Sequence, residues 1–357
     1  MEAYFDYDKV TGLSNALGGR IDLLEKVLGL KVRENLKYSD IQKIAASGLA
    51  NEFFDIGNEI IVPWTDYSVD PPVTYEVPHV IVHFGDAEDP NGNIHKNAMW
   101  LMWKYATPNP VSFDGPEIIE ATEETFQEGW HYYYHSGIYY YEVNVQYGTE
   151  IPNDKTYYKH RRTQYGNILR NGESVWERSA YRQWLNSEAA IGEWWVPTHE
   201  CDVAPAELNT LPGFLTGYSA DWLDIIKPVG VSTVVFIDYP NKHNVIKTYD
   251  KYFIPSTEQL YGIPSYYPPI KQYLEDGQWE YIKEKSGMDH PSNAANSKRT
   301  FPYIVDKATI KLIRLRTASG AFSTGTVECC VNGATPGQII GFVASAGYRT
   351  LPSCVIY

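Results

Sequence analysis

Apolar positions recur along the chain with two different periods. In residues 1–56 they recur at three- and four-residue steps, which predicts an amphipathic helix with a stripe made of Leu13, Leu17, Ile21, Leu24 and Leu28. Ser39 begins a capping-box pattern that predicts a second short helix, and Gly48 is placed to end it. Two interpretations of this N-terminal segment stay open: packing on the rest of the chain, or docking and oligomerisation through copies of itself.

Residues 57–175 show the patterns of strands. Apolar runs and alternation predict three of them, at residues 59–64, 75–84 and 97–103. The last two flank residues 85–93, which are dense in turn formers, so a hairpin with a polar tip is predicted. Tyr-rich residues 129–146 with a central Gly predict a second hairpin. Residues 147–177 are polar and are predicted to be loop or edge strand.

Residues 176–357 combine helical and strand patterns. A compact helix is predicted at residues 179–187, and Ser256 is placed to cap another. One or two helices are predicted at residues 204–226, with buried anchors Leu211, Phe214, Leu215, Trp222, Leu223 and Ile226. Strands are predicted at residues 231–237, 310–315, 326–331, 338–343 and 349–356. The whole pattern predicts an α+β fold in three parts: residues 1–56, 57–175 and 176–357.

The net charge and the composition limit the classes of partner that the chain is expected to bind. The formal net charge of -14 speaks against binding to nucleic acids or to anionic lipid surfaces. The 29 Tyr and 10 Trp suit sheet faces and recognition surfaces alike. The first residues lack the apolar core of a signal peptide, and no apolar stretch reaches bilayer-spanning length. We therefore expect synthesis in the cytoplasm and, for work outside a cell, release with a virion.

The cysteines and histidines give weak chemical signals. Four cysteines, Cys201, Cys329, Cys330 and Cys354, have neither CxxC nor Cys/His metal spacing, so they are predicted to be reduced or buried thiols. His79 and His83 lie four apart on a predicted strand, which is too far for one metal ion unless the strand bends.

Two polar turns could carry chemistry. Residues 86–93 hold side chains that suit calcium, but Gly92 does not fit EF-hand spacing, so a hairpin tip is favoured. His199, Glu200, Cys201 and Asp202 are consecutive; a Cys/His nucleophile pair is one interpretation, and a polar turn is the favoured one. The sequence contains no P-loop, GxGxxG, HExxH or GxSxG motif, and no metal and no cofactor is predicted.

Five separated segments carry a resemblance to a known family. They are WERSAYRQWLNS at residues 176–187, PGFL at 212–215, FIPSTEQ at 253–259, IRLRTA at 313–318 and YRTLPSCVI at 348–356. In this order they resemble an uncharacterised domain family of Gram-positive gut bacteria and their phages, over roughly residues 52–357. The additional segments at residues 62–64 and 82–86 are similar to phage-borne versions.

The resemblance implies a C-type-lectin-like fold, shared with retroelement variable proteins and formylglycine-generating enzymes. It implies that the last strand is buried beside early strands, with Arg349 near the rim and Leu351, Cys354 and Val355 inside. The stretch before it would then form a recognition surface, with candidate ligand-binding residues Thr317, Ser319, Phe322, Thr324, Asn332, Thr335, Phe342 and Tyr348. Gly, Ala, Ser and Thr stand here where family members have aromatic and Asn side chains, which leaves open a shallower site or another binding face.

The function expected from this resemblance is that of a phage virion structural protein, a head or tail fibre or spike that recognises the host surface. The expected partners are a host glycan or protein and, through the N-terminal segment, other virion proteins, in a homo-oligomer for which a trimer is favoured. A bacterial binding module outside a virion is the alternative. An enzyme on the same fold is disfavoured, because the adjacent Cys329 and Cys330 would point to opposite faces of a strand.

Overall fold

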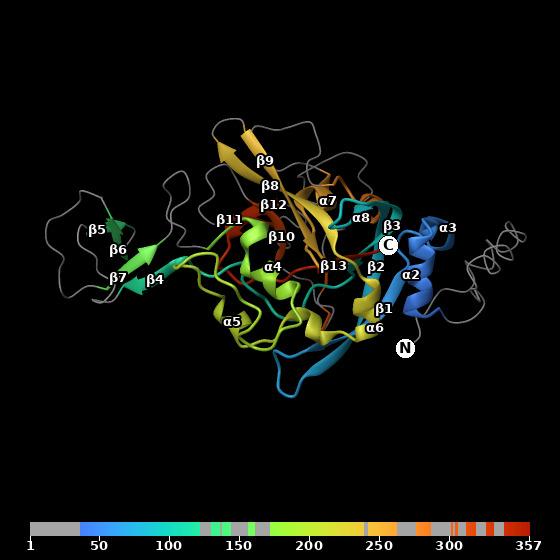
Figure 1. Cartoon of the computed structure of the whole chain (residues 1–357), viewed down its shortest axis with the longest axis horizontal. Helices are drawn as coiled ribbons and strands as arrows, with labels where there is room; N and C mark the ends of the chain where they lie inside the picture. Colours follow the sequence, from blue (N-terminus) through green and yellow to red (C-terminus); the bar gives the residue numbers. More distant parts are fainter. Residues whose placement is uncertain are drawn as a thin grey trace, which may run out of the picture.

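The computed structural model describes residues 36–121, 130–135, 138–143, 156–160, 172–238, 242–262, 276–286, 301–302, 304–305, 312–318, 326–331 and 339–357. Figure 1 shows a body that contains the described helices and most of the strands, and a small sheet that projects from one side. The fold is mixed α+β, with largely antiparallel sheets and several short helices, as the pattern predicts. The division into three parts stays a prediction.

The central sheet has the strand order β1 (Glu59–Asp66), β2 (Val73–Glu88), β3 (Ile94–Trp103) and β13 (Ser353–Ile356), and each strand is antiparallel to its neighbours. The last strand pairs with β3, and all of its residues are buried. The expected burial of Leu351, Cys354 and Val355 is confirmed, since each is 0% exposed. Arg349 is half-buried, and its Nε donates to the Pro108 carbonyl at 3.0 Å.

The strand boundaries in this sheet differ from the sequence prediction, most clearly at the β2–β3 hairpin and at β13. The β2–β3 hairpin continues to the pair Glu88 and Ile94, so its tip is shorter than the predicted residues 85–93. Cross-strand hydrogen bonds satisfy the backbone there, whatever the polarity of the side chains. At the other end, β13 begins at residue 353 instead of 349, because Pro352 has no N–H to donate to a ladder.

The other strands form smaller sheets. A two-stranded sheet pairs β8 (Val229–Asp238) with β9 (Lys242–Asp250), and a three-stranded sheet has the order β10 (Leu312–Ala318), β11 (Thr326–Val331) and β12 (Ile339–Val343). The projecting sheet has the order β4 (Ile118–Ala121), β7 (Tyr157–His160), β6 (Ile138–Val143) and β5 (Trp130–His135). The predicted second hairpin is confirmed as β5–β6. The loop-or-edge prediction is wrong at β7, which lies between β4 and β6 and pairs with β6 in parallel.

The described part of the N-terminal segment packs on the body. Helix α2 (Tyr38–Ala46) begins one residue before the predicted cap Ser39, because the Asp40 carboxylate accepts the Lys37 backbone N–H at 3.2 Å. Gly48, at φ +72°, lies just after the helix, as predicted, and α3 (Ala50–Phe53) follows. The Tyr38 ring lies 5.3 Å from the ring of Trp222. The predicted stripe from Leu13 to Leu28 lies outside the described residues.

The helical block consists of short helices. They are η2 (Trp176–Arg178), α4 (Ala180–Leu185), α5 (Ala206–Asn209), η3 (Phe214–Gly217), α6 (Ala220–Ile225), α7 (Thr257–Tyr261) and α8 (Glu280–Ser286). The predicted cap is confirmed at Ser256, whose side chain accepts the Gln259 N–H. Residues 204–226 form three helices instead of one or two, since Pro212 and Gly213 separate α5 from η3. Of the predicted anchors there, only Leu211 is partly buried.

An aromatic cluster fills the space between β1–β3 and the helices. Trp64 lies 5.2 Å from both Trp103 and Phe214, ring centroid to ring centroid, and Phe214 lies 5.3 Å from Tyr252. Aromatic contacts at these distances add to the stability that burial of the rings provides. The cluster therefore joins the N-terminal strands to the helical block.

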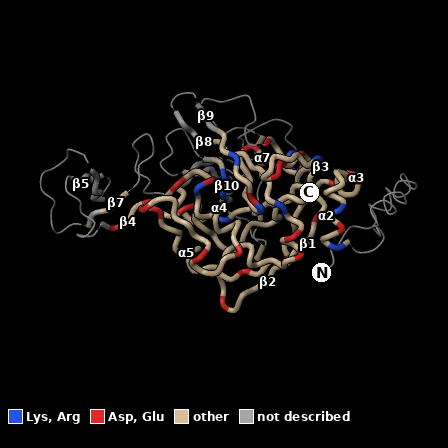
Figure 2. Tube along the Cα trace, viewed as in Figure 1, with Lys and Arg blue, Asp and Glu red and all other residues tan. Residues whose placement is uncertain are grey.

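Acidic and basic residues are both distributed over the body (Figure 2). Among the described residues, none of the helices combines the length and the apolarity that crossing a lipid bilayer requires.

Candidate functional site

A polar cavity of about 350 Å³ lies beside the central sheet. Its walls come from the distal half of the β2–β3 hairpin, from β8 and β9, and from residues 276–279 just before α8. The lining residues are His83, Asp86, Glu88, Ile94, Trp100, Gly230, Ser232, Lys247, Asp276 and Trp279. Its volume falls within the range of ~300–1,000 Å³ that is typical of small-ligand sites.

A local irregularity of β2 positions His83 in the wall. The β2–β3 register shifts between Ile81 and His83, and such bulges re-aim a side chain. A Cβ on Gly85 would overlap the His83 imidazole, so glycine is required for the ring to lie there. The His83 Nδ1 lies 3.6 Å from Glu280 Oε2. Burial lowers the pKa of His83, and the neighbouring Glu280 opposes that shift.

Hydrogen bonds orient the carboxylates at one end of the cavity. Glu88 Oε2 lies 2.6 Å from Lys247 Nζ, and Glu88 Oε1 accepts the Tyr249 hydroxyl at 2.7 Å. The Lys247 and Tyr249 hydrogen bonds lower the pKa of Glu88. Asp86 forms an ion pair with Lys96. The cavity therefore presents ionised, oriented acceptors beside a lysine donor.

Asp276 lines another part of the cavity and is anchored by a buried arginine. Its Oδ2 lies 3.3 Å from a terminal nitrogen of Arg316, and that side chain is 0% exposed. Desolvation raises the pKa of Asp276, while the Arg316 charge lowers it. Arg316 is itself fixed by donation to the Ile254 carbonyl at 2.8 Å and to Gln259 Oε1 at 2.7 Å.

Two tryptophans, one from β3 and one from the residues before α8, complete the cavity. Trp100 and Trp279 are 4% and 2% exposed, so most of each ring is packed in the core. The Trp100 Nε1 is buried and has no hydrogen-bond partner among the residues that the structure describes. Apolar ring surface beside a few oriented polar groups suits a ligand that combines hydroxyl groups with an apolar face.

The predicted ligand-binding residues that the structure describes lie elsewhere. Thr317 is 0% exposed, and its hydroxyl oxygen accepts the Thr257 backbone N–H at 2.9 Å. Tyr348 is half-buried, with its ring 4.5 Å from the Arg314 guanidinium. Neither lines the cavity. The residues Ser319, Phe322, Thr324, Asn332 and Thr335, and the side chain of Phe342, lie outside the described part of the chain.

The residues of the cavity were not predicted as a site from the sequence. His83 was predicted to lie in a strand and Asp86 and Glu88 in a hairpin tip, and no prediction covered Asp276 or Lys247. The dipeptide Asp276-Gly277 is a turn signal and was available in the sequence. No local signal connects that turn with β2, because the two segments meet only in the fold.

The weaker chemical signals are resolved by geometry. His79 contacts the Val77 carbonyl and the Tyr252 hydroxyl inside the core, whereas His83 lines the cavity, so they do not form one metal site. The hairpin-tip prediction is confirmed for residues 89–93, where Asp89 Oδ1 accepts the backbone N–H groups of Asn91 and Asn93. Calcium is not needed to explain this turn.

Residues 199–202 form the predicted polar turn. The His199 Nδ1 accepts the backbone N–H of Cys201 at 3.2 Å, and this contact does not involve the thiol. Burial raises the pKa of the Cys201 thiol to about 11, with a further contribution from Glu200. The thiol is therefore protonated at neutral pH and is a poor nucleophile.

No family model, curated protein or solved structure matches the chain. The family resemblance and the finer fold that it implies therefore stay predictions.

Proposed function

We propose that the chain is a bacteriophage virion protein that recognises the host cell surface and binds a surface glycan in the polar cavity. The observation that carries the proposal is the cavity itself. Oriented carboxylates at Glu88 and Asp276 accept hydrogen bonds from sugar hydroxyls, and Lys247 donates to sugar oxygens. The tryptophan rings, which are largely packed in the core, contribute only a narrow apolar strip to the wall beside these polar groups.

The charges of the cavity favour a glycan over other ligand classes. The walls carry three carboxylates and one lysine, so a phosphate group or a polyanion would be repelled. Residues 348–356, which carry part of the family resemblance, end in the buried strand β13, the position that a C-type-lectin-like fold requires. That fold and the place on a virion are part of the proposal.

The proposal is tested by binding of the fluorescently labelled chain to intact cells of a susceptible host. Periodate, which cleaves the vicinal diols of sugars, should abolish binding, whereas protease treatment of the cells should leave it unchanged. The Lys247→Ala variant should bind at least about tenfold more weakly, because Lys247 is the one lysine among the described residues of the cavity wall and is expected to be among the few residues that carry most of the binding energy. Mass spectrometry of purified particles should detect the chain.

Lys43→Ala is the matched control, because Lys43 also forms a surface ion pair, with Asp40, but lies on α2 away from the cavity. It should bind like the native chain. Periodate-resistant binding, or equal binding by Lys247→Ala, would contradict glycan recognition in this cavity. Absence of the chain from purified particles would favour the binding module outside a virion.

A further inference from the structure

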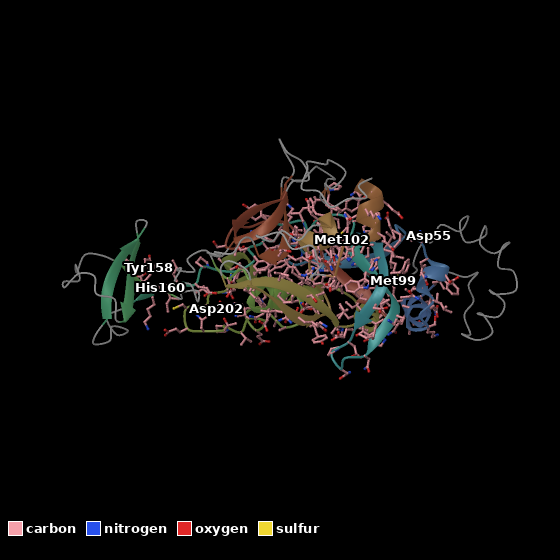
Figure 3. The ribbon with its side chains drawn as sticks, turned by 90° about the horizontal axis from the view of Figure 1, so that it is seen from above. Asp55, Met99, Met102, Tyr158, His160 and Asp202 are labelled. Carbon is pink, nitrogen blue, oxygen red and sulfur yellow. The ribbon has the colours of Figure 1, made fainter. Side chains whose placement is uncertain are left out.

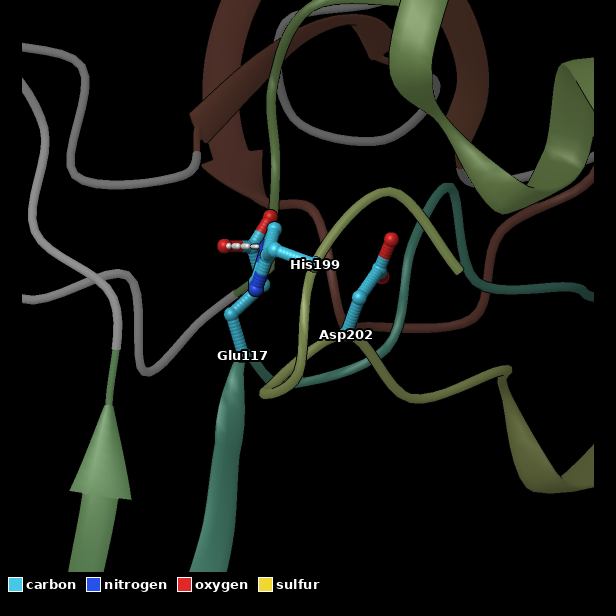
Figure 4. Close-up of side chains that lie close together, drawn as sticks. All are labelled: Glu117, His199 and Asp202. Atoms are coloured by element: carbon cyan, nitrogen blue, oxygen red, sulfur yellow. Dashed lines mark ion pairs between the residues drawn. The ribbon is translucent and has the colours of Figure 1, made fainter. Parts of the chain in front are cut away.

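Three side chains that are distant in the sequence converge at the base of the projecting sheet. Glu117 lies directly before β4, while His199 and Asp202 belong to the turn at residues 198–202. One ligand-type atom from each lies within 4.8 Å of the other two (Figure 4). The closest contact joins His199 Nε2 and Glu117 Oε2 at 2.8 Å.

Asp202 brings a fixed carboxylate into this cluster. Its Oδ2 accepts both the backbone N–H and the hydroxyl of Thr198, each at 2.7 Å. The residue is 9% exposed, and its Oδ1 is buried without a hydrogen-bond partner among the described residues. A buried anionic oxygen without a partner is costly, so it points to a ligand that would satisfy it.

Glycines allow the chain segments to approach this closely. A Cβ on Gly115 would overlap the Val203 carbonyl group, so only glycine lets the segment before Glu117 lie against the end of the turn. Gly172, at φ +84°, is similarly close to the Gly115 carbonyl. The Asp114 carboxylate also accepts the backbone N–H groups of Glu173 and Ala180, at 2.7 and 3.0 Å. The arrangement is therefore set by the backbone and not by flexible side chains alone.

We propose that Glu117, His199 and Asp202 bind a divalent first-row transition-metal ion such as Zn²⁺. In a tetrahedral zinc site, ligand atoms at about 2.0–2.2 Å from the ion lie roughly 3.3–3.6 Å apart. The His199–Glu117 pair at 2.8 Å would therefore open slightly, and the widest spacing, within 4.8 Å, would close by about 1 Å through side-chain rotation. An imidazole nitrogen with two carboxylates favours zinc or a similar ion over Ca²⁺ or Mg²⁺, which take oxygen ligands. This site is separate from the polar cavity and independent of the proposed glycan binding.

The ring proton of His199 must move when the ion binds. In the structure Nδ1 accepts the Cys201 N–H, so the neutral ring carries its proton on Nε2, facing Glu117. An ion between Nε2 and Oε2 takes the place of that proton. The proton then moves to Nδ1, and the 3.2 Å contact with the Cys201 N–H opens. If the ring is protonated on both nitrogens beforehand, one proton is released to solvent.

The location suggests what the ion would do. Figure 3 shows Asp202 on the side of the body that faces the projecting sheet, where Tyr158 and His160 are labelled. Strand β7, which carries both, pairs with β4 directly after Glu117. An ion held by Glu117 and the turn would therefore strengthen the link between the base of this sheet and the turn, where Lys159 of β7 already lies 3.5 Å from Glu200.

The test uses the untagged full chain, stripped of metal with a chelator and dialysed. Titration with Zn²⁺ in a calorimeter and with Co²⁺ in a visible spectrometer should both give one saturable site per chain. Glu117→Gln and Asp202→Asn should each lower the Zn²⁺ affinity by at least about tenfold. Asn at 202 keeps an oxygen for the Thr198 donors and places an NH2 group at the Oδ1 position, so the turn should be retained.

Glu200→Gln is the matched control, since Glu200 belongs to the same turn, its side chain is 69% exposed, and Gln keeps an oxygen for the 3.5 Å contact with Lys159. It removes one negative charge and should leave the affinity unchanged. Absence of saturable binding to the native chain would overturn the proposal, and so would equal affinity in Asp202→Asn. Should either variant fail to melt cooperatively, the native titration and the other variant still decide the question.

Discussion

Two histidines of this protein, His79 and His199, lie in polar surroundings that differ in whether every buried polar atom has a hydrogen-bond partner. His79 is 0% exposed, and its Nδ1 donates to the Val77 carbonyl at 3.1 Å, because a carbonyl can only accept. Its Nε2 therefore accepts the Tyr252 hydroxyl at 3.0 Å, and Tyr252 in turn accepts the Trp222 Nε1–H at 2.9 Å. The cluster of Glu117, His199 and Asp202 instead contains a buried carboxylate oxygen with no such partner.

The difference separates a polar group that stabilises the fold from one placed for a ligand. The network around His79 is neutral and each of these polar atoms has a partner, so it rigidifies the core without exposing a charge. The cluster around His199 concentrates carboxylates and leaves one oxygen unsatisfied, which lowers the stability of the metal-free chain. Sites that bind ligands commonly lower the stability of the ligand-free protein in this way.

Deletion of residues 348–357 should have the largest effect, because it removes β13 and Cys354, which contacts Tyr252. Buried side chains such as Leu351, Val355 and Ile356 each contribute about 1.5–3 kcal/mol. Their sum approaches the ~5–15 kcal/mol net stability of an ordinary domain. We expect loss of cooperative thermal unfolding. Deletion of the terminal Tyr357 alone is the control, and a normal melting curve for the longer deletion would contradict the architecture.

Tyr252→Phe should have the next largest effect. It removes the hydroxyl that pairs with both His79 and Trp222 and leaves two buried polar atoms without a partner. The free energy of unfolding should fall by roughly 2–6 kcal/mol in chemical denaturation, since each of the two orphans costs ~1–3 kcal/mol. The Zn²⁺ affinity should not change.

Tyr249→Phe serves as the matched control, because the Tyr249 hydroxyl donates to the partly exposed Glu88. Water can replace that contact, so the loss should stay below about 1 kcal/mol. Equal losses in the two variants would show that the network around His79 has no special role in the core.

Individual helices and strands were predicted from the sequence better than the contacts between them. Alternation located β1, the apolar run located β8, and the Ser256 cap located α7, because these signals act within a few residues. The partner of His79 lies 173 residues away, and no local pattern names it. The same holds for Glu117 and the turn at 198–202, which meet only because Gly115 permits close approach.

The cavity was missed for a related reason. Its residues come from β2, β3, β8, β9 and residues 276–279, and each of them reads locally as a strand or turn residue. The burial of the strand at residues 353–356 was predicted through the family resemblance, which drew on segments of the chain that are consecutive in sequence. Polar residues have many possible partners, so their convergence follows from tertiary structure alone.

The pH dependence of stability gives a sharper test of the network. Burial lowers the pKa of His79 to about 3, while the unfolded chain keeps the ordinary value of 6.5. The stabilisation is therefore fully present above pH 6.5 and is lost as the pH falls toward the folded value. Between pH 6 and pH 5 this group should cost about 1.4 kcal/mol. Its neighbours Tyr252, Tyr218 and Trp222 do not titrate there.

His79→Gln isolates this contribution, because the amide can still donate to Val77 and accept from Tyr252 but does not titrate. Carboxylates elsewhere titrate alike in both proteins, so the difference between the two stability profiles reports His79. Denaturant unfolding at pH 6 and pH 5 measures it. Parallel profiles would mean that the ring is not held neutral by burial.

Asp202→Asn in the metal-free chain should have the smallest effect on the free energy of unfolding. Unlike the other variants, it should not lower it. Burial raises the pKa of Asp114 well above its usual value, and the nearby Asp202 and Glu117 carboxylates raise it further, so negative charge is crowded here. Removing one charge while keeping an acceptor for Thr198 should leave the free energy of unfolding unchanged or raise it by up to about 1 kcal/mol. Denaturant unfolding in the presence of a chelator measures this. A loss comparable with that of Tyr252→Phe would mean that Asp202 supports the fold as His79 does, and the distinction between the two histidine environments would then fail.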